Sequence, residues 1–289
     1  MILAIIQWYY VWTYISIEKR QNKLYFLISL FPVSTGCCLV AMYCPRTAIL
    51  VSSLGLLYFL TCLFVLVSLI RHLADGRASL SLMLRQHGKM INFQSPPFCC
   101  CMPCLPKILP TEKNLRRLEW IVLQAPIVRA LIVLSEVVAV AEKREHAIVW
   151  IQFCDVASLA SLLMAIFGIH TLARLVSDKL SRYGFMGIFR IVDLSLLFFS
   201  AQQPILFENI FLRFGVITCG PLLSPHDNAR FICNFVIICE LFLLSLLATF
   251  LVSPARNNLF DLYHDKSRGL HQTSGSSSTT EETLLTIDA

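Results

Sequence analysis

Residues 47–70 read TAILVSSLGLLYFLTCLFVLVSLI and contain no charged side chain. A transmembrane helix needs about 20 consecutive apolar residues, so this stretch is long enough to span a bilayer. The composition of the whole chain agrees, since 56% of its 289 residues are hydrophobic and only 15% are charged. A soluble domain of this size could not bury so much apolar surface. The chain is therefore predicted to be an all-α integral membrane protein.

Further apolar stretches on both sides of residues 47–70 bring the number of predicted transmembrane helices to seven, all within residues 1–253. They are residues 1–17, 24–44, 120–141, 147–170, 186–207 and 231–253. The first is short and is interrupted by Gln7, and its 17 residues reach only about 26 Å as a helix. A helix that thins the bilayer and a sequence that lacks the start of this helix both remain open as explanations.

The distribution of lysine and arginine predicts the orientation of these helices. The first, third and fifth connecting segments and the C-terminal tail hold 17 Lys and Arg residues, against five in the other connections. Because cytoplasmic loops carry the excess of positive charge, the N-terminus is predicted outside and the C-terminus in the cytoplasm. Basic loops that face anionic lipid also account for the net charge of +6, so no nucleic-acid partner is expected.

Two segments outside the membrane have distinct compositions. Residues 71–119 are predicted to form a basic cytoplasmic loop whose first part, residues 71–90, is an amphipathic helix on the membrane surface. Residues 95–110 hold five prolines, which predicts an extended backbone. Residues 254–289 include a Ser/Thr run and cannot bury a core, so they are predicted to be a disordered cytoplasmic tail.

Four cysteines lie close together in the basic loop, namely Cys99, Cys100, Cys101 and Cys104. Thiols beside a membrane favour S-acylation, so covalent palmitate is the first interpretation. A zinc site is the second, although adjacent thiols do not easily converge on one tetrahedral ion and no second Cys/His pair follows nearby. Reduced thiols without a role are the third. No other cofactor and no metal is expected.

Cys219 and Cys233 flank the last predicted outer loop. Their short separation favours a disulfide if that loop faces an oxidising compartment. Cys44, at the outer end of the second helix, is a competing partner.

Ionisable side chains at membrane depth are costly and mark candidate functional sites. Glu240 is the most isolated, since no other charge lies within two turns, and it needs a partner on another helix or a wet cavity. Arg129 in the fourth predicted helix is the natural partner. Arg190 and Asp193 are three residues apart and are expected either to neutralise each other or to take part in transport.

Other polar residues lie nearer to helix ends or beside a proline. Glu136 is predicted to reach water by snorkelling, and His170 to lie at the interface. In the sixth helix, Pro204 frees a backbone carbonyl, and the amides of Gln202 and Gln203 can line a polar path. A plain packing kink is the alternative for this motif.

The order of these features resembles that of the organic solute transporter alpha subunit family. The matching features are Cys44-Pro45-Arg46, the cysteine run followed by Leu115-Arg116-Arg117, Gln203-Pro204 in the sixth helix and Glu240 in the seventh. Gln124 and Arg129 in the fourth helix add a looser resemblance to the wider superfamily of seven-helix proteins.

The resemblance implies facilitated, bidirectional passage of amphipathic organic anions, such as bile acids or steroid sulfates, across the plasma membrane. It also implies a single-span beta-type partner subunit, and it leaves a higher oligomer open. The implied substrate path consists of Arg129, Arg190, Gln202, Gln203 and Glu240. Its arginines would attract the anionic head, and the phenylalanines Phe198, Phe199 and Phe207 would suit a steroid-like body.

A seven-helix signalling receptor or scaffold without transport activity is the alternative function, because its helix count and orientation are the same. Against a receptor, the third helix runs into Ile70-Arg71-His72 without a D-R-Y-like triplet. A membrane zinc hydrolase would need several histidines at membrane depth, where only His170 comes near, so no catalytic residue is expected. A retinal protein would need a lysine in residues 231–253, which contain none.

Overall fold

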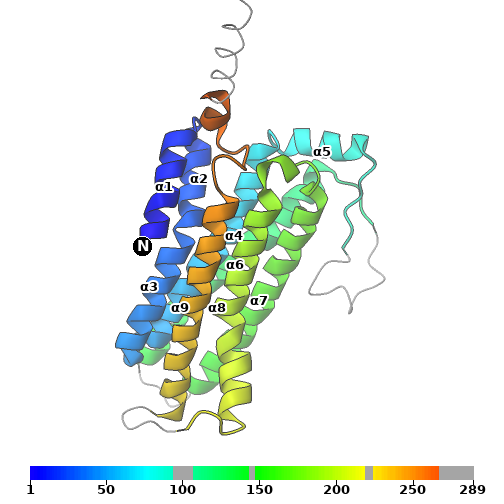
Figure 1. Cartoon of the computed structure of the whole chain (residues 1–289). Helices are drawn as coiled ribbons and strands as arrows, with labels where there is room; N and C mark the ends of the chain where they lie inside the picture. The colour runs from blue at the N-terminus through cyan, green and yellow to red at the C-terminus, as the bar shows by residue number, and fades with distance from the viewer. Residues whose placement is uncertain (94–106, 143–146, 219–223, 267–289) are drawn as a thin grey trace, which may run out of the picture.

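The computed structural model of the chain describes residues 1–93, 107–142, 147–218 and 224–266. In this part the elements are helical apart from one antiparallel bridge between Ile91 and Ile108. Most of the helices run along one common axis and form a bundle (Figure 1). In chain order they are α1 (Ile2–Tyr14), α2 (Glu18–Ile28), α3 (Leu30–Tyr43), η1 (Pro45–Thr47), α4 (Ala48–Leu73), α5 (Arg77–Gln86), α6 (Glu112–Ala141), α7 (Ala147–Val176), η2 (Ser181–Tyr183), α8 (Phe185–Ala201), η3 (Gln202–Leu212) and α9 (Pro225–Leu251).

Six helical segments of the described chain are long and apolar enough to cross a membrane. They are Glu18–Tyr43, Pro45–Leu73, Glu112–Ala139, Phe153–Val176, Phe185–Leu212 and Pro225–Leu251. The remaining predicted span, residues 1–17, forms α1, whose 13 residues reach only about 20 Å against a hydrocarbon core of about 30 Å. An all-helical membrane fold with six candidate spans is therefore supported, whereas a seventh span and an outside N-terminus are not confirmed.

The polar residue that interrupts α1 makes its contact with α9. Gln7 is buried, and its Nε2 donates to the carbonyl of Ser245 at 3.2 Å and to Oγ1 of Thr249 at 2.6 Å. An unpaired amide would be costly among apolar helices, so these bonds fix where α1 packs on α9.

The span Glu18–Tyr43 is divided into α2 and α3 at Ser29. Pro32 has no backbone N–H to donate to the carbonyl four residues earlier, which explains a break in the hydrogen-bond ladder at this point. The Ser29 hydroxyl adds a second hydrogen bond at 2.7 Å to the carbonyl of Tyr25, which also accepts the Ser29 N–H at 2.9 Å.

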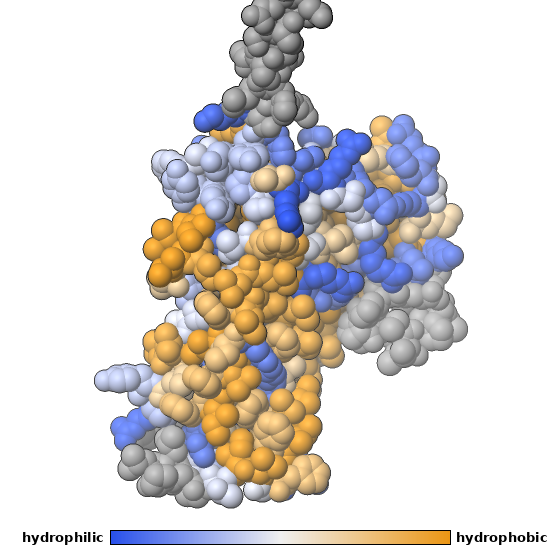
Figure 2. All heavy atoms as spheres, viewed as in Figure 1, coloured by the Kyte–Doolittle hydropathy of each residue, from blue (hydrophilic) through white to orange (hydrophobic). Residues whose placement is uncertain are grey.

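The end of α1, helix α5 and the last described residues lie at the same end of the bundle (Figure 1). In the view of Figure 2, hydrophilic side chains gather at this end, and hydrophobic side chains cover most of the visible face below it. The predicted amphipathic helix is present as α5, which buries Leu80 and Leu84 while Arg85 is exposed. The cysteines of the predicted acylation site lie within residues 94–106, outside the described residues.

The first part of the predicted disordered tail packs on the bundle. Leu259 and Phe260 are buried, and residues 261–266 are helical. The side chain of Asn257 supports this turn by accepting the Leu259 N–H at 3.0 Å. The tail boundary predicted at residue 254 is therefore wrong. The prediction rested on the polar composition of the whole segment, which does not show that Leu259 and Phe260 are buried. Residues 267–289 lie outside the described part.

Candidate functional site

A cavity of about 460 Å³ lies between α4, α6, α7, α8, η3 and α9. Its lining combines charged and amide groups with aliphatic and aromatic side chains. The lining residues are Ala48, Ile49, Ser52, Ser53, Leu56, Arg129, Glu136, Asp155, Val156, Ser158, Leu159, Leu162, Phe199, Ser200, Gln203, Pro204, Glu208, Arg230 and Asn234. Ligand sites in helical membrane proteins are built in this way, with a few polar groups in a mostly apolar pocket.

Arg129 is the central polar residue of this cavity and is buried on α6. Its Nη2 donates to Oγ of Ser53 on α4 at 2.7 Å, and its Nη1 donates to Oγ of Ser158 on α7 at 3.0 Å. Glu136 lies two helical turns further along α6, with Oε1 3.8 Å from Nη1 of Arg129. Ser53 donates in turn to Oε2 of Glu136 at 3.0 Å, so one serine connects both charges.

This pairing leaves part of the guanidinium unused. Nε of Arg129 is buried and has no hydrogen-bond partner among the described residues. The Arg129–Glu136 separation of 3.8 Å is longer than a hydrogen bond, so Glu136 balances the charge without occupying every donor.

A second charged group lies on η3 and α9. Gln203 Nε2 donates to Oε1 of Glu208 at 3.2 Å, and the same oxygen lies 3.8 Å from Nε of Arg230. This Nε is also buried without a hydrogen-bond partner in the described chain. The cavity is thus lined by two arginines, accompanied by the carboxyl groups of Glu136, Asp155 and Glu208.

The segment that carries Gln203 and Glu208 is a π-helix of 11 residues, η3. Pro204 cannot donate a backbone hydrogen bond, and the predicted disruption of the sixth helix at this motif is therefore present as a wider helix. Two side-chain bonds in η3 join residues five apart, Gln203 to Glu208 and Asn209 to the Pro204 carbonyl at 2.6 Å. This spacing matches the i to i+5 pattern of a π-helix.

One wall of the cavity depends on a close approach between α4 and α8. A Cβ at Gly55 would lie 2.5 Å from Cζ of Phe199, so only glycine lets this ring pack as it does. Phe199 also packs against Phe59, with ring centroids 5.0 Å apart. These two aromatic rings connect the apolar side of the cavity to the buried core.

A family model described as "Organic solute transporter Ostalpha" matches residues 1–256. The chain belongs to this family. It is 56% identical to organic solute transporter alpha-like protein 3 of Caenorhabditis elegans over 98% of this chain and 81% of that protein. It is 34% identical to alpha-like protein 2 of the same organism over 90% of this chain and 76% of that protein. No solved structure matches the chain.

Membership of this family confirms the resemblance, and together with the six candidate spans it identifies a multi-pass membrane protein. The structure brings two of the predicted path residues, Arg129 and Gln203, to the cavity. The other three are not among its lining residues. Gln202 and Glu240 bond to each other, and Arg190 is exposed on α8 with its guanidinium 5.8 Å from the centre of the Phe189 ring.

The predicted pair of Arg129 and Glu240 is wrong. Arg129 pairs with Glu136, whereas Gln202 Nε2 donates to both carboxylate oxygens of Glu240, at 2.7 and 2.8 Å. Glu136 is buried by this pair, so its predicted snorkelling to water is also wrong.

Asp193 is paired with His170 and not with Arg190. Nε2 of His170 lies 3.1 Å from Oδ1 of Asp193. His170 is buried because α7 continues to Val176, so the predicted interfacial position at a helix end is wrong. Of the predicted phenylalanines, Phe199 lines the cavity and Phe207 is buried in the core.

Among the lining residues that bond to or pair with the charged and amide side chains of the cavity, four were not identified from the sequence, namely Ser53, Ser158, Glu208 and Arg230. Serines are common in membrane helices, so nothing marks these two in advance. Glu208 and Arg230 lie at predicted helix boundaries, where a charge has an ordinary explanation. The spacing of Arg129 and Glu136 was a usable signal, since residues seven apart share one helix face.

The remaining predictions concern cysteines and metals. Cys233 is buried, and Cys219 lies outside the described residues, so the disulfide between them stays a prediction. Among the described residues no group of His, Cys, Asp and Glu is arranged to hold a metal ion.

Proposed function

We propose that the chain is the multi-span subunit of a facilitative, bidirectional transporter of amphipathic organic anions, with bile acids and steroid sulfates as candidate substrates. The relatives in Caenorhabditis elegans carry the name organic solute transporter alpha-like protein. One observation carries the anionic specificity: the guanidinium of Arg129 is buried, lines the cavity and lies 3.8 Å from its counter-charge Glu136, beyond hydrogen-bond distance. Such a donor suits a carboxylate or sulfate oxygen.

The walls of the cavity supply the other half of the specificity. Leu56, Leu159, Leu162 and Phe199 line it beside Arg129. A rigid apolar body with one anionic group would place the anion at the guanidinium and its body against these side chains. The carboxylate of Glu136 limits how strongly an anion binds, and moderate binding is what release on the far side of a membrane requires.

The proposal includes the assembly and location that the family resemblance implies. These are a single-span beta-type partner and a position in the plasma membrane. The proposal also includes palmitate on Cys99, Cys100, Cys101 and Cys104, which the position of these thiols in a basic loop beside the membrane favours. Membrane lipids then contact both the bundle and the acylated loop.

The test is uptake and efflux of a labelled steroid sulfate by cells that express the chain with candidate single-span partners. The informative variant is the double change Arg129→Gln with Glu136→Gln, because it removes a buried cation and its counter-charge together. We expect surface expression near that of the unchanged protein and transport at least about tenfold lower, since one charge-assisted hydrogen bond contributes about that factor.

Arg190→Gln is the matched control, because it removes an arginine from α8 that does not line the cavity. We expect it to transport normally. Normal transport by the double variant, with loss in Arg190→Gln, would place the path on the outer surface of α8. Absence of transport by the unchanged chain with every partner would favour the receptor or scaffold alternative.

A further inference from the structure

A second polar pocket includes the start of α5, the helix that lies at one end of the bundle in Figure 1, and it shares no lining residue with the cavity already described. It has a volume of about 380 Å³ and lies between the end of α4, the start of α5 and the first turns of α6. Its lining residues are Phe64, Arg71, Arg77, Arg116, Glu119, Trp120 and Leu123. Three arginines therefore share this pocket with a single carboxylate.

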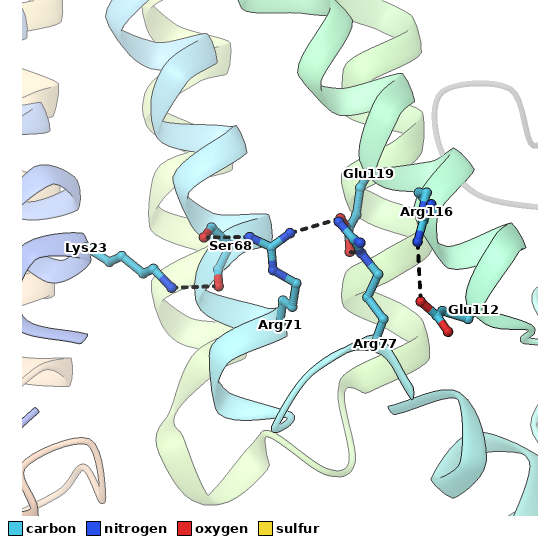
Figure 3. Close-up of polar contacts among 7 residues, drawn as sticks. All are labelled: Lys23, Ser68, Arg71, Arg77, Glu112, Arg116 and Glu119. Atoms are coloured by element: carbon cyan, nitrogen blue, oxygen red, sulfur yellow. Dashed lines mark hydrogen bonds and ion pairs between the residues drawn. The ribbon is translucent and has the colours of Figure 1, made fainter. Parts of the chain in front are cut away.

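Glu119 holds two of the arginines in place, as Figure 3 shows. Arg77 donates to it from Nε at 3.0 and 2.9 Å and from Nη2 at 2.7 Å, in a bidentate arrangement. Arg71 Nη1 approaches the same carboxylate at 3.4 Å, and its Nη2 lies 3.5 Å from Oγ of Ser68. The carboxylate is largely buried, so it orients these guanidinium groups before any ligand arrives.

The positive charge of the pocket is not balanced by this one carboxylate. Arg116 turns away from Glu119 toward Glu112, which lies outside the lining, at 3.4 Å and with both side chains about half exposed. Within the described chain, Nη1 of Arg77 and Nε of Arg71 have no hydrogen-bond acceptor. The spare donors of three guanidinium groups therefore point to an anionic ligand with several oxygens.

The apolar side of the pocket identifies the source of that anion. Trp120 is 60% exposed next to Glu119, where an indole suits the boundary between lipid headgroups and hydrocarbon. From Trp120 a line of apolar side chains not covered by protein continues along α6, through Ile127, Leu131 and Leu134. Their spacing of seven, four and three residues keeps them on one helix face. A soluble anion would leave this surface unused, whereas acyl chains would cover it.

We propose that the pocket of Arg71, Arg77 and Arg116 binds the headgroup phosphate of an anionic glycerophospholipid, whose acyl chains lie along α6 below Trp120. Basic pockets between transmembrane helices are suited to anionic headgroups on the side of the membrane where lysine and arginine are in excess. The bound lipid would join α4, α5 and α6 through one phosphate.

The test uses the purified full chain and native mass spectrometry with phosphatidylglycerol or phosphatidylcholine as the probe. Arg71→Gln with Arg116→Gln removes two ligands but keeps the Arg77–Glu119 pair, so no buried carboxylate is left unpaired. We expect phosphatidylglycerol binding to fall at least about tenfold, since hydrogen bonds to charged groups are worth that much. The matched control is Arg85→Gln with Arg182→Gln, two exposed arginines that do not line the pocket and whose replacement changes the net charge equally.

Selective loss in the pocket variant supports the proposal, and equal losses in both double variants would overturn it in favour of general electrostatic attraction. Equal binding of phosphatidylcholine and phosphatidylglycerol would also overturn it.

Trp120→Ala distinguishes a lipid from a soluble anion, because this change should weaken the binding of lipid but not that of inorganic phosphate. Complete displacement of the lipid by inorganic phosphate, with no effect of Trp120→Ala, would reassign the pocket to a soluble anion. Arg71→Lys with Arg116→Lys keeps both positive charges and should show intermediate binding. This variant tests the pocket if the glutamine variant does not fold.

Discussion

Glu240 illustrates how an isolated charge is kept inside a helical bundle without an ionic partner. Both of its oxygens accept from Nε2 of Gln202 on η3, and neither residue lines the cavity. A glutamine at position 240 keeps a hydrogen-bonding tip, so we expect Glu240→Gln to show surface expression and steroid sulfate uptake near those of the unchanged chain.

Glu240→Leu is the contrasting change, because it leaves the Gln202 amide unpaired, at a cost of about 1 to 3 kcal/mol. We expect lower surface expression, measured by surface biotinylation. Strong loss of transport by Glu240→Gln at normal expression would contradict this and would return Glu240 to the substrate path.

Single residues show which part of the site the sequence could predict. The cost of a charge at membrane depth identified Arg129 and Glu136 as candidates, and both line the cavity. Their partners were not predictable in the same way, because pairing depends on helix rotation and relative depth, which hydropathy does not encode. Arg129 was assigned to a distant helix although a carboxylate lay two turns away on its own helix.

At the scale of elements, the π-helix η3 sets the position of two cavity residues. Gln203 and Glu208 are five apart, and in an α-helix their side chains would diverge by about 140°, so their bond at 3.2 Å depends on the wider turn. Pro204→Ala restores a backbone donor and favours the α-helical register. We expect transport to fall by several fold at normal surface expression, measured by uptake of labelled steroid sulfate.

Gln203→Ala provides the comparison for this prediction. It removes the same side-chain bond without changing the backbone donor, so a similar fall in both variants is expected. Normal transport in Pro204→Ala would show that the register of η3 does not matter for the path.

Long apolar stretches predicted where six of the membrane helices lie, because every backbone group in lipid must be paired within a helix. The same reasoning did not predict where a helix ends when its last turns are buried against other helices. The sequence prediction ended one span at His170, yet α7 continues to Val176, and His170 is paired with Asp193 on α8. The length of α1 was already visible in the sequence, but its docking on α9 through Gln7 was not.

At the scale of the whole molecule, Asp261 joins the described end of the chain to the connection between α1 and α2. Burial alone would raise the pKa of Asp261, but donors from Ser16 and Leu262, with Arg20 3.8 Å away, hold this pKa below its ordinary value. The contribution to docking is therefore present above the unfolded aspartate pKa of about 3.9 and is lost as the pH falls through the lower folded value.

We accordingly expect the hydrogen-exchange protection of residues 254–266, corrected for intrinsic rates, to be constant near neutrality and to decrease below about pH 4. Asp261→Asn should lower this protection at neutral pH and remove the acid transition. Asp265→Asn, an exposed neighbour in the same segment, should behave like the unchanged chain. An acid transition that persists in Asp261→Asn would assign it to another group.

Five candidate spans separate Cys44 from the C-terminal residue Ala289, which predicts that the two residues lie on opposite sides of the membrane. The excess of lysine and arginine at the α5 end predicts that Ala289 is cytoplasmic.

We expect a tag after Ala289 to react with antibody only after permeabilisation, whereas exposed Cys44 should react with an impermeant maleimide on intact cells. The labelling uses a Cys219→Ser background, so that the connection before α9 does not contribute, with Cys44→Ser as the control. The reverse pattern would show an inverted bundle, and reaction of both sites on intact cells would mean that one of the five spans does not cross.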